Sequence, residues 1–187
     1  MHYNFPIKFY FINSFKKNKI DNLDNNTGII YRNYKQKLDI NEIKNLKNYC
    51  SKKNIKFYLS NDFRNALKLG LDGAYLPSFN KSCKHLNYTI NTSFLLLGSA
   101  HNIKEIREKE KQKVNLIFLS SIFKFNKNYL GTHKFIKLKS FTNKKVVALG
   151  GISKDNFKKI KILNCYGVAG ISYFEKKRPL KRGPFKK

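Results

Sequence analysis

The chain has few cysteines and no long apolar run, and each shortage excludes a class of protein. No apolar run approaches the ~20 residues that a membrane-spanning helix needs. Cys50, Cys83 and Cys165 are odd in number, widely separated and free of CxxC spacing, which argues against a zinc site. The stretch FPIKFYFIN is interrupted by Lys8 and lacks a small-residue cleavage site, so it predicts a strand and not a signal peptide. These features indicate a protein of the reducing cytoplasm.

Acidic residues are also scarce: 11 Asp and Glu stand against 39 Lys and Arg, which gives a net charge of +28. Such a charge suits nucleic acid, an anionic membrane surface or a phosphorylated ligand as partner. Lys, Asn, Ile, Phe and Tyr are over-used together, as an AT-rich genome encodes, so mutational bias accounts for part of the charge. The densest basic run, residues 175–187, contains two prolines and has no apolar periodicity. We expect a flexible basic tail there, after a single domain of residues 1–174.

Short β-rich runs alternate with polar helical segments along the chain. The predicted strands cover residues 7–13, 28–34, 56–61, 73–78, 94–100, 115–121, 146–152 and 167–174. The predicted helices cover residues 40–53, 63–69, 101–113 and 153–164, the last with Ser153 as its N-cap. Segment 14–26 is polar and short, so we expect its helix to be reduced or missing. An open flank there would favour a homodimer.

Eight strand–helix steps in one small α/β domain fit a compact (β/α)8 barrel, and a doubly wound open sheet fits the same alternation. Polar residues and glycines at the strand ends favour the barrel, because a barrel gathers them at one mouth whereas an open sheet scatters them along an edge. These residues are Arg32, Asn61, Asp62, Ser78, Ser99, His101, Ser120, Ser121, Gly150, Gly151 and Ser172.

The stretch VVALGGISKDN, residues 146–156, places two adjacent glycines at the end of a buried strand. Glycine weakens a strand end, so the pair predicts a backbone that another group approaches closely. One interpretation is a phosphate held at the start of a helix, and the other is a tight strand-to-helix turn with nothing bound. The stretch by itself does not favour either.

Four motifs in order resemble one family, the thiamine-phosphate synthase and thiazole tautomerase superfamily of small barrels. They are LSNDFRNALKLGLDGAYLP (59–77), GSAH (98–101), VVALGGI (146–152) and GVAGIS (167–172). The resemblance runs from about residue 28 to residue 174. It implies a barrel that joins a pyrimidine diphosphate to a thiazole phosphate with Mg²⁺ and releases pyrophosphate. A diphosphate leaving group needs cations and neutral donors at the mouth, which is consistent with that chemistry.

The resemblance also implies roles for individual residues. Asp62 matches the carboxylate that binds Mg²⁺, although capping the helix that starts at Phe63 is a competing interpretation. The residues that match diphosphate contacts are Arg32, Asn61, Ser99 and, with one gap, Lys127. The residues that would hold the thiazole phosphate are Gly150, Gly151, Ile171 and Ser172. His101 matches a family histidine, and capping of the following helix is again an alternative.

Several positions depart from the synthase pattern. Ile30 and Tyr34 stand where a synthase has Gln and Lys, and Lys35 or Lys37 would have to substitute for the missing charge. Asn80 stands in place of the second metal carboxylate, so metal affinity should fall.

Three more departures concern the far side of the mouth and the tautomerase. The loop FKFNKNYLG replaces a Thr-rich one, and Tyr75 replaces a histidine. Ser121 stands where a tautomerase places a histidine, and serine alone is no base near neutral pH, which excludes the tautomerase activity.

Three hypotheses follow. The first is a thiamine-phosphate synthase-like transferase of thiamine biosynthesis. The second is a barrel that keeps the phosphate cradle, binds a phosphorylated metabolite and has lost catalysis. The third is a nucleic-acid-associated protein that uses the tail and surface lysines, although the chain contains no motif that reads RNA or DNA.

Overall fold

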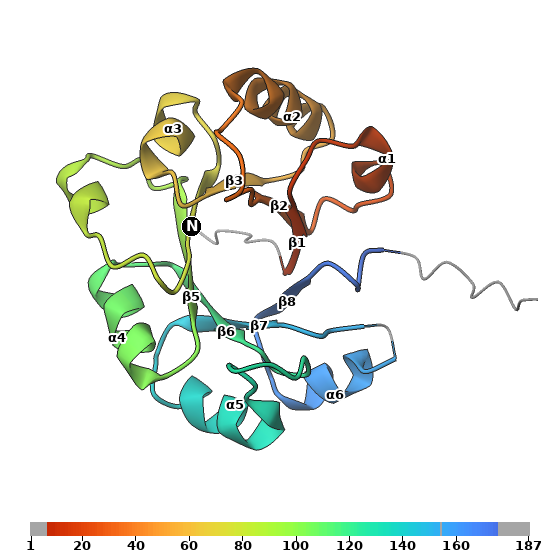
Figure 1. The fold of residues 1–187 in the computed structure, drawn as a ribbon, viewed down its shortest axis with the longest axis vertical. Coiled ribbons are helices and arrows are strands. Elements are labelled where there is room, and N and C mark those ends of the chain that lie inside the picture. The colour runs from red at the N-terminus through yellow and green to blue at the C-terminus, as the bar shows by residue number, and fades with distance from the viewer. Residues whose placement is uncertain (1–6, 154, 176–187) are drawn as a thin grey trace, which may run out of the picture.

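A computed structural model describes residues 7–153 and 155–175 of the chain, and within them the strands form a closed parallel barrel. Each strand pairs with the next in sequence, and the last pairs with the first (Figure 1). The strands are β1 (Lys8–Ile12), β2 (Thr27–Tyr31), β3 (Phe57–Ser60), β4 (Gly73–Leu76), β5 (Leu95–Ala100), β6 (Leu116–Ser120), β7 (Lys145–Leu149) and β8 (Gly167–Gly170). The predicted (β/α)8 barrel is therefore confirmed, and the open-sheet alternative is wrong.

Helices form an outer ring around the strands (Figure 1). They are α1 (Lys17–Ile20), α2 (Ile40–Lys52), α3 (Phe63–Lys68), the 3-10 helix η1 (Lys84–Asn87), α4 (Ile103–Lys111), α5 (Gly131–Lys139) and α6 (Phe157–Ile162). The predicted N-cap at Ser153 is wrong, because the backbone N–H of Ser153 donates to Asn156 Oδ1 and α6 begins only at Phe157. No helix among the described residues is long and apolar enough to cross a membrane.

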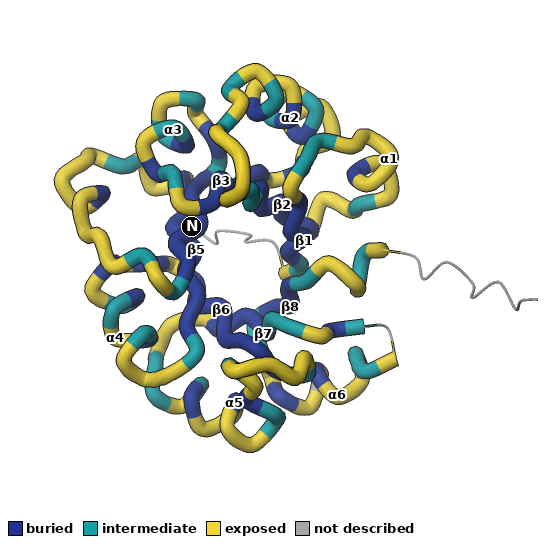
Figure 2. The backbone as a smooth tube through the Cα atoms, viewed as in Figure 1, coloured by how far each residue is buried: buried dark blue, intermediate teal, exposed yellow. Residues whose placement is uncertain are grey.

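Successive side chains of each strand point alternately into the barrel and toward the helices, which gives two separate hydrophobic cores. On β1, Phe9 and Phe11 point into the barrel, whereas Tyr10 and Ile12 join the layer between strands and helices. Rings fill the barrel interior edge to face: the centroids of Phe11 and Tyr75 lie 5.3 Å apart, and those of Tyr75 and Phe118 lie 5.4 Å apart. Figure 2 shows the strand ring as an almost continuous buried band. The barrel is thus a packed core, and a ligand can enter only at its rims.

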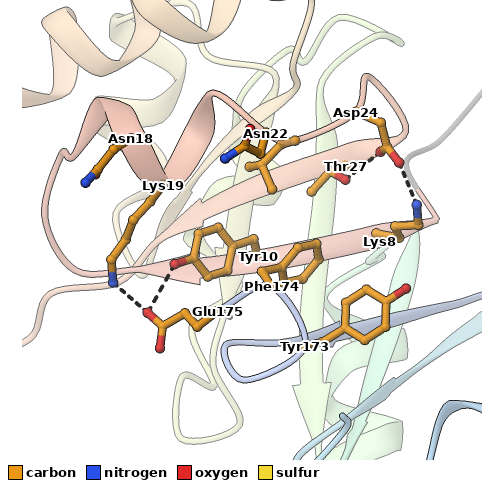
Figure 3. Close-up of a pocket in the computed structure, with 11 residues that line it drawn as sticks. Lys8, Tyr10, Asn18, Lys19, Asn22, Asp24, Thr27, Tyr173, Phe174 and Glu175 are labelled. Atoms are coloured by element: carbon orange, nitrogen blue, oxygen red, sulfur yellow. Dashed lines mark hydrogen bonds and ion pairs between the residues drawn. The ribbon is translucent and has the colours of Figure 1, made fainter. Parts of the chain in front are cut away.

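The outer layer is thin beside β1, as the polar segment 14–26 predicts. Helix α1 has only 4 residues, and a cavity of about 790 Å³ lies between it and the segment after β8 (Figure 3). Its charges pair with each other: Lys19 Nζ lies 2.5 Å from Glu175 Oε1, and Lys8 Nζ lies 2.6 Å from Asp24 Oδ2. Glu175 is also the only described residue of the predicted tail; residues 176–187 lie outside the described part.

The N-cap of α4 is Asn102, so the capping interpretation of His101 is wrong. Asn102 Oδ1 accepts the backbone N–H of Glu105 at 2.9 Å. Replacing Asn102 with alanine is expected to lower the free energy of unfolding by about 1 kcal/mol, because the first turn of α4 loses an acceptor. Urea denaturation of Asn102→Ala beside Asn102→Asp checks this, since aspartate caps equally well. Equal losses in both variants would contradict the capping role.

Candidate functional site

The barrel brings every predicted site residue to one rim, the mouth formed by the carboxyl ends of the parallel strands. Arg32 follows β2, Asn61 and Asp62 follow β3, Ser99 lies near the end of β5, and Gly150 and Gly151 follow β7. Asn80 and Lys127 lie in the loops after β4 and β6, and Ile171 and Ser172 follow β8. Contacts link some of these residues directly, and others share only the rim.

Asn61, Asp62 and Asn80 form one cluster on the β3–β4 side. They line a cavity of about 220 Å³. Asn80 Nδ2 donates to Asn61 Oδ1 at 2.8 Å, which ties the loop after β4 to the turn after β3. Asn61 has a φ of 61°, a left-handed conformation that asparagine tolerates, and this turn leads directly into Asp62.

Asp62 is the N-cap of α3. Its Oδ1 accepts the backbone N–H of Asn65 at 3.0 Å, and its Oδ2 accepts Asn65 Nδ2 at 2.7 Å. The competing interpretation of Asp62 as a cap is thus correct. Capping the helix leaves Asp62 able to bind a ligand, because each carboxylate oxygen has a second lone pair.

The cluster fits a magnesium ion that arrives with a phosphorylated ligand, and it is not a complete metal site by itself. Asn80 Oδ1 accepts the backbone N–H of Ser82 at 2.9 Å, so that oxygen is already engaged. No group of three or more His, Cys, Asp or Glu side chains in the described part of the chain could hold a metal ion. Mg²⁺ commonly takes one or two carboxylates plus phosphate oxygens and water, and Asp62 would supply the one carboxylate.

Arg32 lies on the β1–β2 side of the mouth. Its guanidinium carbon is 4.7 Å from the centroid of the Phe11 ring, and its backbone N–H donates to Ile12 O at 2.7 Å. No ion pair within the described residues involves Arg32. A cavity of about 260 Å³ is lined by Arg32 together with Phe11 and Ile171, which joins the start of the barrel to the segment after β8. Arg32 is thus a fixed cation at the mouth with capacity for an anion.

Tyr34 replaces the expected lysine with an uncharged contact. Its hydroxyl shares a 2.7 Å hydrogen bond with Ser60 Oγ, and its ring meets that of Phe79 edge to face at 5.6 Å. Tyr34 and Phe79 are nevertheless 50% and 62% exposed, so an aromatic edge lines this side of the mouth.

Tyr75 closes the barrel below the mouth. It is buried, and Ser99, which acts on its hydroxyl, is itself only 5% exposed. Burial raises the pKa of Tyr75 above its usual value, so its hydroxyl stays neutral.

The two glycines after β7 are explained first by the chain itself. Gly150 and Gly151 have φ values of 100° and 74°, which disfavour any side chain. A Cβ on Gly151 would lie 2.5 Å from the backbone N of Lys124, and one on Gly150 would lie 2.4 Å from Ser121 Oγ. The loop after β6 crosses this turn, with the Phe123 N–H donating to Gly150 O at 2.9 Å. The closely approaching group is therefore, at least in part, this loop.

Lys127 is exposed in the same loop, and no hydrogen bond or ion pair ties it to another described residue. The rings of Phe125 and Tyr129 stack in the same loop with centroids 4.2 Å apart.

His101 lies between β5 and α4. Its Nδ1 lies 2.6 Å from Ser120 O, which fixes its ring to β6.

Sequence reasoning did not single out Lys109, which is fully buried in α4 and contacts the loop of Asn80. A partial signal was its place three residues after the buried Ile106, on the face of α4 that packs inward.

Comparisons with known proteins agree with the geometry. The sequence model of a family described as thiamine monophosphate synthase matches residues 24–174. A thiamine-phosphate synthase of Prochlorococcus marinus is 31% identical over 137 residues, 71% of this chain and 40% of that protein. A thiamine-phosphate synthase of Methanococcus vannielii is 32% identical over 83 residues, 42% of this chain and 40% of that protein. The chain thus matches about 40% of the length of these curated relatives.

A solved structure supports the fold. Thiamine phosphate pyrophosphorylase from Pyrococcus furiosus superimposes with a TM-score of 0.74 at 21% identity, over 90% of this chain and 87% of that one.

Proposed function

The chain belongs to the thiamine monophosphate synthase family, and on that premise we propose that it joins hydroxymethylpyrimidine diphosphate to hydroxyethylthiazole phosphate. A bond forms between the thiazole nitrogen and the methylene carbon of the pyrimidine. The bond from that carbon to the diphosphate oxygen breaks, and pyrophosphate leaves with the electron pair. The barrel of residues 1–174 is the unit proposed to carry out this transfer.

One observation carries the proposal: Arg32, which has no ion pair among the described residues, and the Asn61–Asp62–Asn80 cluster lie at the same mouth. A leaving diphosphate gains negative charge as its bond breaks, so fixed donors and cations there speed the reaction. Arg32 would bind the diphosphate through its planar fork, and Asn61 and Ser99 would donate or orient polar contacts. Lys127, exposed on the loop after β6, would add a second cation.

A bound Mg²⁺ would neutralise the diphosphate charge, with Asp62 as its carboxylate ligand and Asn80 beside it. On the opposite side of the mouth, backbone N–H groups of Gly150, Gly151, Ile171 and Ser172 would hold the thiazole phosphate. Gly151, Ile171 and Ser172 are exposed, which leaves this edge accessible to a ligand.

A second candidate is a family member that binds a phosphorylated metabolite without turnover. The Tyr34–Ser60 hydrogen bond favours it, because an uncharged contact stands where the family pattern has a cation. The Asn80 oxygen engaged by Ser82 also favours it, because it weakens the second metal ligand.

Incubation with Mg²⁺ and both substrates, followed by oxidation of the product to a fluorescent derivative, separates the candidates. We expect thiamine phosphate above a no-enzyme control. A thermal shift with thiazole phosphate but no product would support binding without turnover. The absence of both product and any thermal shift with a phosphorylated ligand would contradict both candidates.

A further inference from the structure

Two fully buried polar side chains, Lys109 and Gln112, lie at the C-terminal end of α4. Lys109 Nζ donates to Pro77 O at 2.8 Å, to Asn80 O at 2.7 Å and to Gln112 Oε1 at 2.8 Å. An ammonium group has three donors, and here each one has an acceptor. Two of these acceptors belong to the loop after β4, so Lys109 holds that loop against α4.

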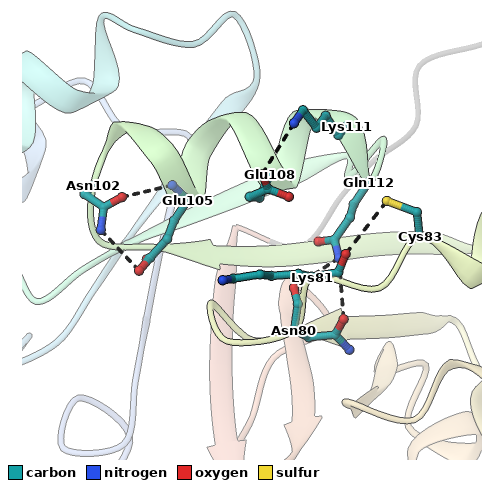
Figure 4. A network of polar contacts seen from close by, with 8 residues as sticks. All are labelled: Asn80, Lys81, Cys83, Asn102, Glu105, Glu108, Lys111 and Gln112. Carbon is teal, nitrogen blue, oxygen red and sulfur yellow. Dashed lines mark hydrogen bonds and ion pairs between the residues drawn. The ribbon is translucent and has the colours of Figure 1, made fainter.

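Gln112 holds the same loop from the next turn. Its Nε2 donates to Ser82 O at 2.9 Å and to Asn80 O at 3.1 Å. Figure 4 shows Gln112 pointing from the end of α4 toward Asn80 and Lys81. The backbone carbonyl of Asn80 therefore accepts hydrogen bonds from two side chains, while its side-chain Nδ2 donates to Asn61 Oδ1 at 2.8 Å. A continuous set of contacts thus runs from α4 to the residue that precedes Asp62.

Gly98 on β5 provides the path for the lysine stem. A Cβ at Gly98 would lie 2.8 Å from Lys109 Cδ and 3.0 Å from Val114 Cγ1. The stem therefore crosses β5 where that strand has no side chain. The buried position of Lys109 therefore depends on the space that Gly98 leaves beside β5.

Burying a charged ammonium group costs desolvation free energy. Desolvation lowers the pKa of Lys109 to about 8, and no carboxylate accepts a hydrogen bond from it within the described chain. A neutral donor could bind the same carbonyl groups at a smaller desolvation cost. The cation adds something a neutral donor lacks, which is positive charge one hydrogen bond away from the loop that carries Asn80.

We propose that Lys109 and Gln112 are positioning residues for the diphosphate end of the mouth: they fix the loop of residues 77–82 and so set where Asn80, Asn61 and Asp62 present their side chains. This inference rests on the proposed function. It predicts that the pair governs affinity for a magnesium–diphosphate group and leaves the phosphate edge at β7 and β8 unaffected.

The test uses the full chain, with Lys109→Met and, as matched control, Lys111→Met on the exposed face of α4. Titration calorimetry with inorganic pyrophosphate and MgCl2 is expected to show a Kd about tenfold weaker in Lys109→Met and unchanged in Lys111→Met. The KM for the pyrimidine diphosphate should rise by a similar factor, while the KM for thiazole phosphate stays the same. Amide exchange followed by mass spectrometry should speed up in residues 77–88 of Lys109→Met alone.

Each result decides something. Wild-type protein that binds no pyrophosphate would contradict the proposed function, whatever the variants do. Wild-type binding with an equal Kd in Lys109→Met would overturn the positioning role and leave the proposed function intact. If Lys109→Met fails to fold, Gly98→Ala takes its place, because it displaces the lysine stem without removing a polar group. Its control is Gly170→Ala, where an added Cβ meets nothing within 4 Å. Equal pyrophosphate affinity in these two glycine variants would likewise overturn the role.

Discussion

Replacing Asp62 with asparagine is expected to lower the rate of thiamine phosphate formation by about 100-fold or more. Asp62 is the only carboxylate in the cluster with Asn61 and Asn80, so the substitution removes the only negatively charged metal ligand proposed there. Loss of one group that stabilises developing charge typically costs a factor of about 100 to 1,000 in kcat. Steady-state kinetics at saturating Mg²⁺ and substrates measures the effect.

The asparagine variant separates the ligand role of Asp62 from its capping role. An asparagine oxygen can still accept the backbone N–H of Asn65, so α3 keeps its cap. Asp62→Ala loses both roles, and its free energy of unfolding is expected to be about 1 kcal/mol lower than that of Asp62→Asn. A wild-type rate in Asp62→Asn would rule out the proposed ligand role.

Asp39→Asn is the matched control for this prediction. Asp39 caps α2 by accepting the backbone N–H of Asn41 at 2.8 Å, so it is a second aspartate cap, and it is not among the proposed site residues. Its rate should stay at the wild-type value. An equal loss of rate in Asp39→Asn would show that the change at Asp62 reflects general charge and not a specific site.

The order of the barrel strands could be predicted because their residues are apolar on both faces. β6, for example, is buried at every position, and both cores draw on it. Helix α5 was not predicted, because its inward residues Phe135 and Leu138 are few and Leu130 provides no side-chain cap. Tertiary packing of these two side chains, which no local pattern reveals, holds α5 in place.

The candidate site was predictable as a set of positions and not as a set of contacts. A sequence gives Asp62 both roles, cap and ligand, because both depend on the same carboxylate. In α4, the apolar side chain of Ile103 is 42% exposed, whereas the charged residue Lys109 is fully buried. A lysine in a run of charges is normally solvated, so its burial depends on the gap at Gly98, the carbonyl groups of the neighbouring loop and the side-chain oxygen of Gln112.

Replacing Gly151 with alanine is expected to lower the free energy of unfolding by about 2–4 kcal/mol. Its φ of 74° strains any side chain, and the new Cβ would lie 2.5 Å from the backbone N of Lys124. Backbone atoms cannot rotate away as a flexible side chain can, so the loop after β6 must move. Urea denaturation measures the loss, with Gly170→Ala as a control at which a Cβ meets nothing within 4 Å.

The same variant separates the two explanations for the glycine pair after β7. If chain packing requires Gly151, Gly151→Ala loses stability whether or not a ligand is present, and Gly170→Ala changes stability by less than about 0.5 kcal/mol. If only a phosphate requires it, Gly151→Ala keeps its stability and loses the thermal shift that thiazole phosphate gives the wild type. The 2.9 Å hydrogen bond from Phe123 N–H to Gly150 O favours the first outcome, because the loop already occupies one side of this turn. Thiazole phosphate would then bind on the exposed side of Gly151, and the glycines would serve the loop and the ligand together.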